Sequence, residues 1–332
     1  MDYKEEQQFN EIYEEEMNEI NAQLDKEIVF ALIGDVNAGK SSTVNQLLGE
    51  IVAPVGAQPG ETVMVKKYKY KDKIVFVDTP GLDDIETNHS EQTLSFYKEA
   101  DIVLFFLNAA GTVFSEGEKK LFDIITKVNK KVLIVLNKID AADDIPLLVK
   151  YVQDHTNYQY KVIPISSRTN ENMDMLRNAI LDILHEEKKD ILFAKHLKEK
   201  GKTANKWIIA AASSASAVGA LPLPGSDIVP ITSIQVGLMV RLATLYDKPI
   251  TKKRAKEMAI ASVTGNIGQS LFRQVIKLFP GAGSVVGASV AGSVTLALGY
   301  GIKYAYEQDI ELDVKSLSLI LEKLKQKKLP QA

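Results

Sequence analysis

The chain has 332 residues, of which 45% are apolar and 25% are charged. It is too long for one ordinary domain and suits two, and its composition excludes wholesale disorder. The absence of cysteine excludes disulfides, thiolate metal sites and cysteine nucleophiles, and it agrees with a reducing cytosol.

Charge is distributed unevenly, although the formal net charge is only −3. Residues 1–27 carry 2 basic and 10 acidic side chains, whereas residues 195–332 carry 19 basic and 9 acidic ones. A basic C-terminal part indicates a local anionic partner, either a membrane surface or the acidic N-terminal segment itself, unless the charge is simply solvated. The acidic start lacks an apolar core, so we expect no signal peptide and a cytoplasmic location, with attachment to or insertion in the inner face of the membrane as an open alternative.

Residues 1–26 predict an acidic amphipathic helix. Apolar side chains recur there at steps of three and four, at Phe9, Ile12, Tyr13, Met17, Ile20 and Leu24. An isolated helix of this kind cannot bury its apolar stripe. We therefore expect it to dock on another part of the chain or on a second copy.

Residues 27–188 alternate between apolar strand-like runs and helical patterns. This alternation predicts an α/β domain with a mostly parallel sheet covered on both faces, and with ligand sites at the carboxyl ends of its strands. The predicted strands span residues 28–33, 64–70, 73–78, 102–107, 131–136 and 160–165. The predicted helices span residues 41–48, 91–99, 115–128, 145–155 and 171–184.

The segment from Gly34 to Ser42 fits the phosphate-binding pattern G-x-x-x-x-G-K-[ST], and it lies between a predicted strand and a predicted helix. Gly34 and Gly39 allow the backbone to wind closely around a polyphosphate, so that N–H groups and the helix N-terminus face its negative charge. Lys40 is expected to reach the β- and γ-phosphates. The Ser41 hydroxyl is expected to hold Mg²⁺.

Further signals follow at the ends of predicted strands, in the order that a GTPase requires. The Thr62 hydroxyl and the Asp78 carboxylate can bind Mg²⁺, the latter through water, and the Gly81 N–H can sense a γ-phosphate. Asp140 can accept hydrogen bonds from the N1–H and 2-amino groups of guanine, and adenine offers no such donor pair. The segment Ser166–Arg168 can close over the base. Together these signals predict a site for GTP and GDP rather than ATP.

With these motifs, residues 28–185 resemble a translation-factor-class GTPase of the Era-like type. The resemblance implies Lys40, Ser41, Thr62 and Asp78 for phosphate and Mg²⁺, and Asn137, Lys138 and Asp140 for guanine. The complete predicted nucleotide set is Gly34, Asp35, Asn37, Ala38, Gly39, Lys40, Ser41, Ser42, Gly81, Asn137, Lys138, Asp140, Ser166 and Ser167. Ser166-Ser167-Arg168 departs from the family's usual Ser-Ala-Lys, which weakens only the assignment of base closure.

The catalytic residues are predicted to include Lys40, Asn37 and Thr62. Leu82 stands where Ras-like enzymes carry the glutamine that orients water, and it cannot form that hydrogen bond. Asn37 matches the asparagine that helps potassium-activated relatives hold K⁺, although it can also simply tolerate a strained loop conformation. The loop also resembles that of dynamin-like GTPases, but Val36 and Asn37 replace that family's glutamine and serine.

Residues 189–332 predict an all-α domain that is basic and rich in alanine and glycine, and that the N-terminal helix can join. We expect one connecting helix over residues 191–205. Residues 207–226 and 278–302 carry no charge, over 20 and 25 residues. Pro222 and Pro224 shorten the first run, and serine and glycine dilute both runs, so we expect packed helices, with membrane insertion as the alternative.

This half resembles the uncharacterised helical domain that is often fused to bacterial Era-like GTPases, and more loosely the helical domain of immunity-related GTPases. The basic cluster Lys252-Lys253-Arg254 with Lys256 can engage anionic lipid or can be a solvated helix start.

We favour a GTP-hydrolysing switch or mechanoenzyme at membranes, with homodimerisation through the GTPase domain. One alternative is a ribosome- or RNA-assembly GTPase. The other is a nucleotide-binding scaffold that hydrolyses GTP negligibly. A nucleic-acid partner is not expected, because no separate basic module with interleaved aromatic residues is evident.

Overall fold

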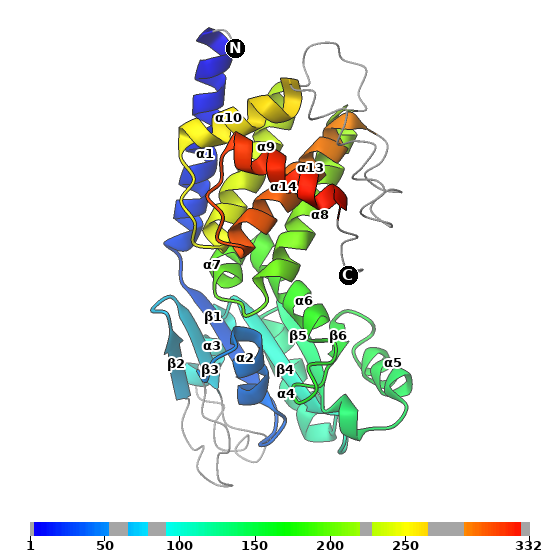
Figure 1. The fold of residues 1–332 in the computed structure, drawn as a ribbon. Coiled ribbons are helices and arrows are strands. Elements are labelled where there is room, and N and C mark those ends of the chain that lie inside the picture. Colours follow the sequence, from blue (N-terminus) through cyan, green and yellow to red (C-terminus); the bar gives the residue numbers. More distant parts are fainter. Residues whose placement is uncertain (1–2, 53–65, 79–90, 220–227, 265–288, 327–332) are drawn as a thin grey trace. The chain divides into compact units, whose positions relative to one another are not determined.

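The computed structural model describes residues 3–52, 66–78, 91–219, 228–264 and 289–326 (Figure 1). The chain divides into two compact units. One consists of Gln23–Lys198, and the other combines Met1–Ala22 with Glu199–Ala332. The N-terminal helix therefore joins the C-terminal helices, as its apolar stripe predicts.

The first unit is built on a six-stranded sheet with the order β2-β3-β1-β4-β5-β6. Its strands are β1 (Ile28–Ile33), β2 (Lys66–Tyr70), β3 (Ile74–Asp78), β4 (Ile102–Asn108), β5 (Val132–Asn137) and β6 (Lys161–Pro164). All neighbouring strands run parallel except β2, which is antiparallel to β3 and forms one edge of the sheet. This arrangement confirms the predicted α/β class.

Helices cover both faces of this sheet, which is why its central strands are apolar throughout. They are α2 (Lys40–Leu48), α3 (Glu91–Glu99), α4 (Glu116–Val128), α5 (Ile145–His155), α6 (Met173–Glu186), α7 (Asp190–Lys195) and the short 3₁₀ turn η2 (Ile139–Ala141). Side chains of α3, α4 and α5 share one core with Ala31, Phe105 and Ile134 of the sheet. On the other face, α6 lies against β4 and β5, and Phe193 of α7 packs on Phe30 with ring centroids 5.0 Å apart.

The single connecting helix predicted over residues 191–205 is wrong. The structure has α7 ending at Lys195 and a second helix beginning at Lys200. The break lies where the Lys198 N–H donates to the Leu47 carbonyl at the end of α2, at 3.1 Å, instead of continuing a helical ladder. This contact keeps the segment on the first unit, which ends at Lys198 rather than at residue 188.

The described part of the second unit is helical. It contains α1 (Tyr3–Leu24), α8 (Lys200–Gly219), α9 (Ile228–Leu245), α10 (Lys252–Thr264), α13 (Val290–Glu307) and α14 (Val314–Gln326). Helices α8 and α13 pack closely because Gly292 and Gly299 leave room for Ser216 and Ile208 of the facing helix. A Cβ atom at Gly292 would lie 1.7 Å from the Ser216 Oγ. The glycines that dilute the apolar runs therefore serve helix packing, as the sequence suggests.

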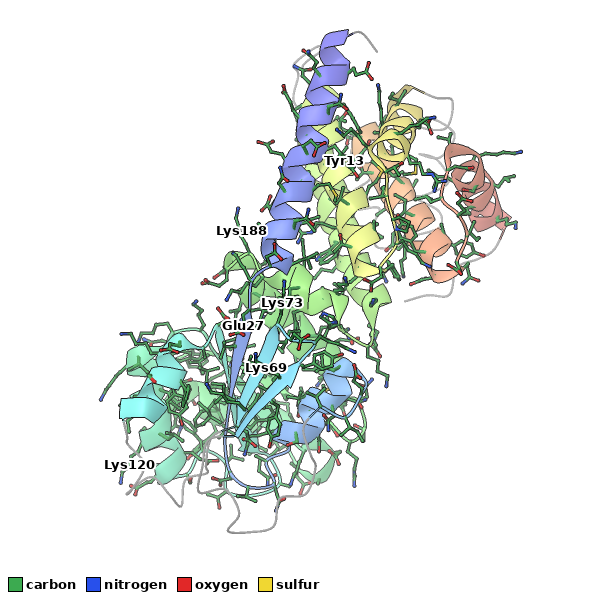
Figure 2. The ribbon with its side chains drawn as sticks, turned by 90° about the vertical axis from the view of Figure 1, so that its left-hand side faces the viewer. Tyr13, Glu27, Lys69, Lys73, Lys120 and Lys188 are labelled. Atoms are coloured by element: carbon green, nitrogen blue, oxygen red, sulfur yellow. The ribbon has the colours of Figure 1, made fainter. Side chains whose placement is uncertain are left out.

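Helix α1 is fixed in this unit by its apolar stripe and by its charge. Phe9, Tyr13 and Ile20 are buried, and the Tyr13 hydroxyl donates to the Ile250 carbonyl at 2.8 Å (Figure 2). The basic start of α10 faces the acidic helix, because Lys252 pairs with Glu14 at 2.5 Å and Lys256 pairs with Glu6. Two members of the predicted basic cluster thus find their anionic partner within the same unit, and Arg254 pairs with Glu311.

Neither uncharged run is described along its whole length. Residues 207–219 lie in α8 and residues 290–302 lie in α13, whereas residues 220–227 and 265–288 fall outside the described ranges. None of the helices within those ranges combines the length and the apolar character that a membrane crossing requires.

Candidate functional site

The carboxyl ends of the parallel strands meet at one edge of the sheet, and most of the predicted site residues follow them directly. The phosphate-binding loop begins after β1, Asp78 ends β3 and Asn137 ends β5. Asn137 is paired in register with Asn108 at the end of β4. The segment that begins at Ser166 follows β6 by one residue. Residues distant in the sequence are therefore brought to one edge by the topology.

The loop after β1 has the backbone that the glycine pattern predicts. Gly34 has a φ of 143° and Gly39 a φ of 89°, in a region that favours glycine. A Cβ atom at Gly34 would lie 2.4 Å from the Phe106 carbonyl oxygen, and one at Gly39 would lie 2.1 Å from Asn137 Nδ2. Neither position has room for another residue. Asn37 is also left-handed, with a φ of 67°, which agrees with the conformational interpretation of this residue.

Lys40 begins α2 and turns its ammonium group back along the loop. Its Nζ atom donates to the Gly34 carbonyl at 2.8 Å and to the Asp35 carbonyl at 3.2 Å, and it lies 3.7 Å from Asp78 Oδ1. Ser41 and Ser42 occupy the first turn of the same helix and are partly exposed. The site thus places a cation, helix N-terminal N–H groups and hydroxyls together, as phosphate binding requires.

Asn137 joins the phosphate loop to the loop after β6. The residue is fully buried, and its Nδ2 atom donates to the Ala38 carbonyl at 2.9 Å. Its Oδ1 atom accepts from the Ser167 N–H at 3.1 Å. The amide of Asn137 therefore bridges the two loops, and the contact with guanine that the resemblance implies stays a prediction.

Asp140 lies within η2, shortly after β5, and both its carboxylate oxygens have partners. The Ser166 Oγ atom donates to Oδ1 at 2.5 Å, and an Arg168 guanidinium nitrogen lies 2.7 Å from Oδ2. The Ser166 hydrogen bond first, and the Arg168 charge as a smaller cause, lower the pKa of Asp140 below its ordinary value. The carboxylate is therefore held ionised, as an acceptor for two donors must be. Lys138, just before it, is left-handed with a φ of 66°.

Three predicted residues lie outside the described part of the chain. They are Thr62, Gly81 and Leu82, within residues 53–65 and 79–90. Among the described residues, no group of three acidic or histidine side chains could hold a metal ion.

Two family models match this chain. Residues 29–138 match the family described as 50S ribosome-binding GTPase, and residues 185–308 match a domain of unknown function, DUF697. The chain is 32% identical to GTPase Era of Aquifex aeolicus over 170 residues, which are 47% of this chain and 56% of that protein. It is 34% identical to GTPase Era of Lacticaseibacillus paracasei over 164 residues, which are 46% and 54% of the two chains.

The chain carries an Era-like GTPase domain. The similarity lies in its N-terminal half, and the chain spans little more than half the length of these relatives. The second matched domain confirms the predicted fusion to an uncharacterised helical domain.

Two solved structures of Era are also similar. One is a variant of Aquifex aeolicus Era bound to GDP·AlF₄⁻, at 28% identity with a TM-score of 0.39, covering 48% of this chain and 57% of that chain. The other is Era in complex with MgGDPNP and a segment of 16S ribosomal RNA, at 23% identity with a TM-score of 0.39, covering 57% and 68%. Both TM-scores are too low to indicate a shared overall fold.

Two features of the Era-like GTPase domain do not follow from the sequence patterns. In the sequence, Arg168 is notable only because it departs from the Ser-Ala-Lys motif. Its ion pair with Asp140 depends on the path of the loop after β6. Glu118 is buried at the start of α4, where its carboxylate accepts from the Ser115 N–H at 2.7 Å. Burial first, and the nearby Asp35 charge as a smaller cause, raise the pKa of Glu118. The Ser-x-x-Glu spacing signals this capping box, but nothing local signals its proximity to the phosphate loop.

Proposed function

We propose that the chain binds GTP and hydrolyses it to GDP and phosphate with Mg²⁺. The observation that carries the proposal is the link between two loops of the site. Asn137 bridges the left-handed loop before Lys40 and the loop after β6, whose Ser166 donates to the Asp140 carboxylate.

Guanine selectivity is assigned to Asp140. Its carboxylate can accept from two adjacent N–H donors, which guanine has and adenine lacks. Ser166 and Arg168 support the ionised form by lowering its pKa. Adenine lacks this donor pair, so an adenine base could not hydrogen-bond to the Asp140 carboxylate in the same way. The missing hydrogen bonds would lower the binding free energy.

Magnesium is assigned to the Ser41 hydroxyl and the Asp78 carboxylate, with Thr62 as a further ligand. These oxygen donors suit a hard cation, and when bound the ion would neutralise charge that develops on the phosphates. Lys40 would exchange its loop carbonyls for phosphate oxygens. The helix N-terminus at Gly39 and Lys40 would hold the same phosphates.

Hydrolysis also needs a group that orients the attacking water and a counter-charge beside the phosphates. Leu82 cannot supply it, so we propose that Asn37 holds a monovalent cation beside the phosphates, where K⁺ would supply counter-charge. The loop position of Asn37, exposed and directly before Ala38 and Gly39, supports this role. Equal turnover in K⁺ and in Na⁺ would contradict it.

For the cellular role, the description of the matching family favours a ribosome-associated GTPase. It weakens the sequence-based expectation that nucleic acid is not a partner. A switch at anionic membranes, with homodimerisation, is the second candidate. The basic cluster on α10 is the feature that favours it, but two of its lysines already pair with α1.

The test measures GTP affinity and GTP turnover for the full chain and for Lys40→Ala, with Lys119→Ala as the matched control because Lys119 is exposed on α4. Charged hydrogen bonds contribute about 1.5–3 kcal/mol each, so we expect Lys40→Ala to weaken GTP binding roughly 10- to 150-fold. Lys119→Ala should behave as the parent. Stimulation by 50S subunits would support the ribosomal role, and stimulation by anionic liposomes alone would support the membrane role. Retained GTP affinity in Lys40→Ala would refute the site.

A further inference from the structure

The edge strand β2 and the turn after it are unusually basic. Residues 66–73 read Lys-Lys-Tyr-Lys-Tyr-Lys-Asp-Lys, with five lysines in eight positions. Strand geometry turns alternate residues to opposite faces, so Lys67 and Lys69 share one face and Tyr68 and Tyr70 share the other. The two lysines thus form a row along the edge strand.

The two faces differ in exposure. Lys67 and Lys69 are exposed and stand opposite Val77 and Val75 of β3 in the antiparallel register. Tyr70, on the other face, is buried, and its hydroxyl donates to Glu50. The buried tyrosine is therefore used for packing, and the lysines face solvent.

Only part of this positive charge is compensated. Lys71 lies 3.7 Å from Glu50, and Lys73 pairs with Asp25 at 3.1 Å. Lys67 has its Nζ atom 4.3 Å from the centroid of the Phe96 ring. Within the residues that the structure describes, no carboxylate lies at ion-pair distance from Lys67 or Lys69.

We propose that Lys67 and Lys69 of this strand form a contact surface for the phosphate backbone of RNA. A strand fixes alternate lysines in a straight row with a repeat of about 6.6–6.8 Å, which suits a polymer whose charges also repeat regularly. Lysine is a point charge without the planar fork that reads bases, so the contact is independent of sequence.

This inference goes beyond GTP hydrolysis and does not depend on it. The same lysines could instead have a structural role, because charged residues on an edge strand prevent the edge strands of two molecules from pairing. The two roles predict different results. If that is their whole purpose, replacing them should cause association of the chain and leave its affinity for RNA unchanged. Light scattering distinguishes the two roles.

The experiment measures binding of a fluorescent single-stranded RNA of mixed sequence by the full chain across a KCl series. The variant is Lys67→Ala with Lys69→Ala, and the matched control is Lys119→Ala with Lys120→Ala. The control pair is also exposed but lies on α4, where Figure 2 shows Lys120 well away from Lys69. GTP turnover without RNA is measured in parallel. A chain that does not hydrolyse GTP can therefore be distinguished from one that does not bind RNA.

For single strands each phosphate contact contributes roughly 0.7 to the slope of log affinity against log salt. We expect the β2 variant to reduce that slope by about 1.4, which corresponds to ~25-fold over a tenfold change in salt. The loss should be the same for RNAs of different sequence, and the control should keep the parental slope. Absence of salt-dependent RNA binding, an unchanged slope in the variant, or an equal loss in the control would overturn the proposal. Tighter binding of a polyglutamate peptide than of RNA would also overturn it, by assigning the row to an acidic protein.

Discussion

Glu118 is a residue whose charge state should affect stability. Its carboxylate closes the capping box of α4 with Ser115 and is buried, and burial raises its pKa above the ordinary 4.5. The folded chain therefore binds this proton more tightly than the unfolded chain does. The resulting contribution to stability is greatest below the ordinary pKa and is lost as the pH rises through the raised one.

Glu118→Gln keeps an acceptor for the Ser115 N–H and removes the buried charge. We expect the difference in free energy of unfolding, parent minus variant, to fall as the pH rises from mildly acidic to neutral. Glu118→Ala should instead lose the cap, at a cost of about 0.5–2 kcal/mol. Urea denaturation at several pH values measures both effects. A difference between parent and Glu118→Gln that does not change with pH would contradict the burial argument.

Single residues of the site were predictable where a motif fixes both type and position. Lys40 and Ser41 belong to one loop, and Asp78 and Asn137 end strands whose order in the sheet brings them to the same edge. The ion pair of Arg168 with Asp140 was not predictable. It depends on the path of a loop whose Asn170 and Asn172 adopt left-handed conformations.

Among the elements, α1 is held in its unit by buried apolar side chains and by polar contacts with the segment Ile250–Lys256. Phe9 is one of its anchors and is only 1% exposed. Phe9→Ala should lower the free energy of unfolding of the helical unit by about 3–5 kcal/mol, because it leaves a cavity as well as losing buried apolar surface. The control is Glu15→Ala on the same helix, where an exposed side chain should contribute no more than about 0.5 kcal/mol.

The chain supplies its own probe for this measurement. Trp207 is the only tryptophan, and it lies on α8 within the helical unit, with the Arg241 guanidinium 4.8 Å from the centroid of its ring. Its fluorescence during denaturation therefore reports on that unit separately from the GTPase unit. Equal stability of Phe9→Ala and the parent would mean that α1 is not anchored as described.

The ends of most elements were close to those expected from periodicity, since β1, α3 and α5 begin and end where the sequence places them. The helix expected over residues 191–205 was wrong because its interruption has a tertiary cause, the bond from Lys198 to Leu47. Strand β2 lies within the predicted range 64–70. The row of Lys67 and Lys69 was not predictable, because it depends on the position of β2 at the edge of the sheet.

At the scale of the whole molecule, the sequence predicted an α/β domain followed by an all-α domain. It also predicted that the N-terminal helix can join the C-terminal helices. Opposite charges on α1 and α10 account for part of the uneven charge along the chain, since Glu6 and Glu14 pair with Lys256 and Lys252. The unit boundary at Lys198 could not be predicted, because α7 is held to the sheet by Phe193 and not by any local signal.

We propose that this chain holds a guanine nucleotide through Asp140 and the loop around Lys40. The most direct measurement is the affinity of the full chain for GDP and for ADP, by calorimetry, in the parent and in Asp140→Ala. We predict that the parent prefers GDP by at least about tenfold, since two hydrogen bonds to a charged group are involved, and that Asp140→Ala loses most of this preference while Lys40 still holds phosphate. Equal affinity of the parent for GDP and ADP, or an unchanged preference in Asp140→Ala, would contradict this claim.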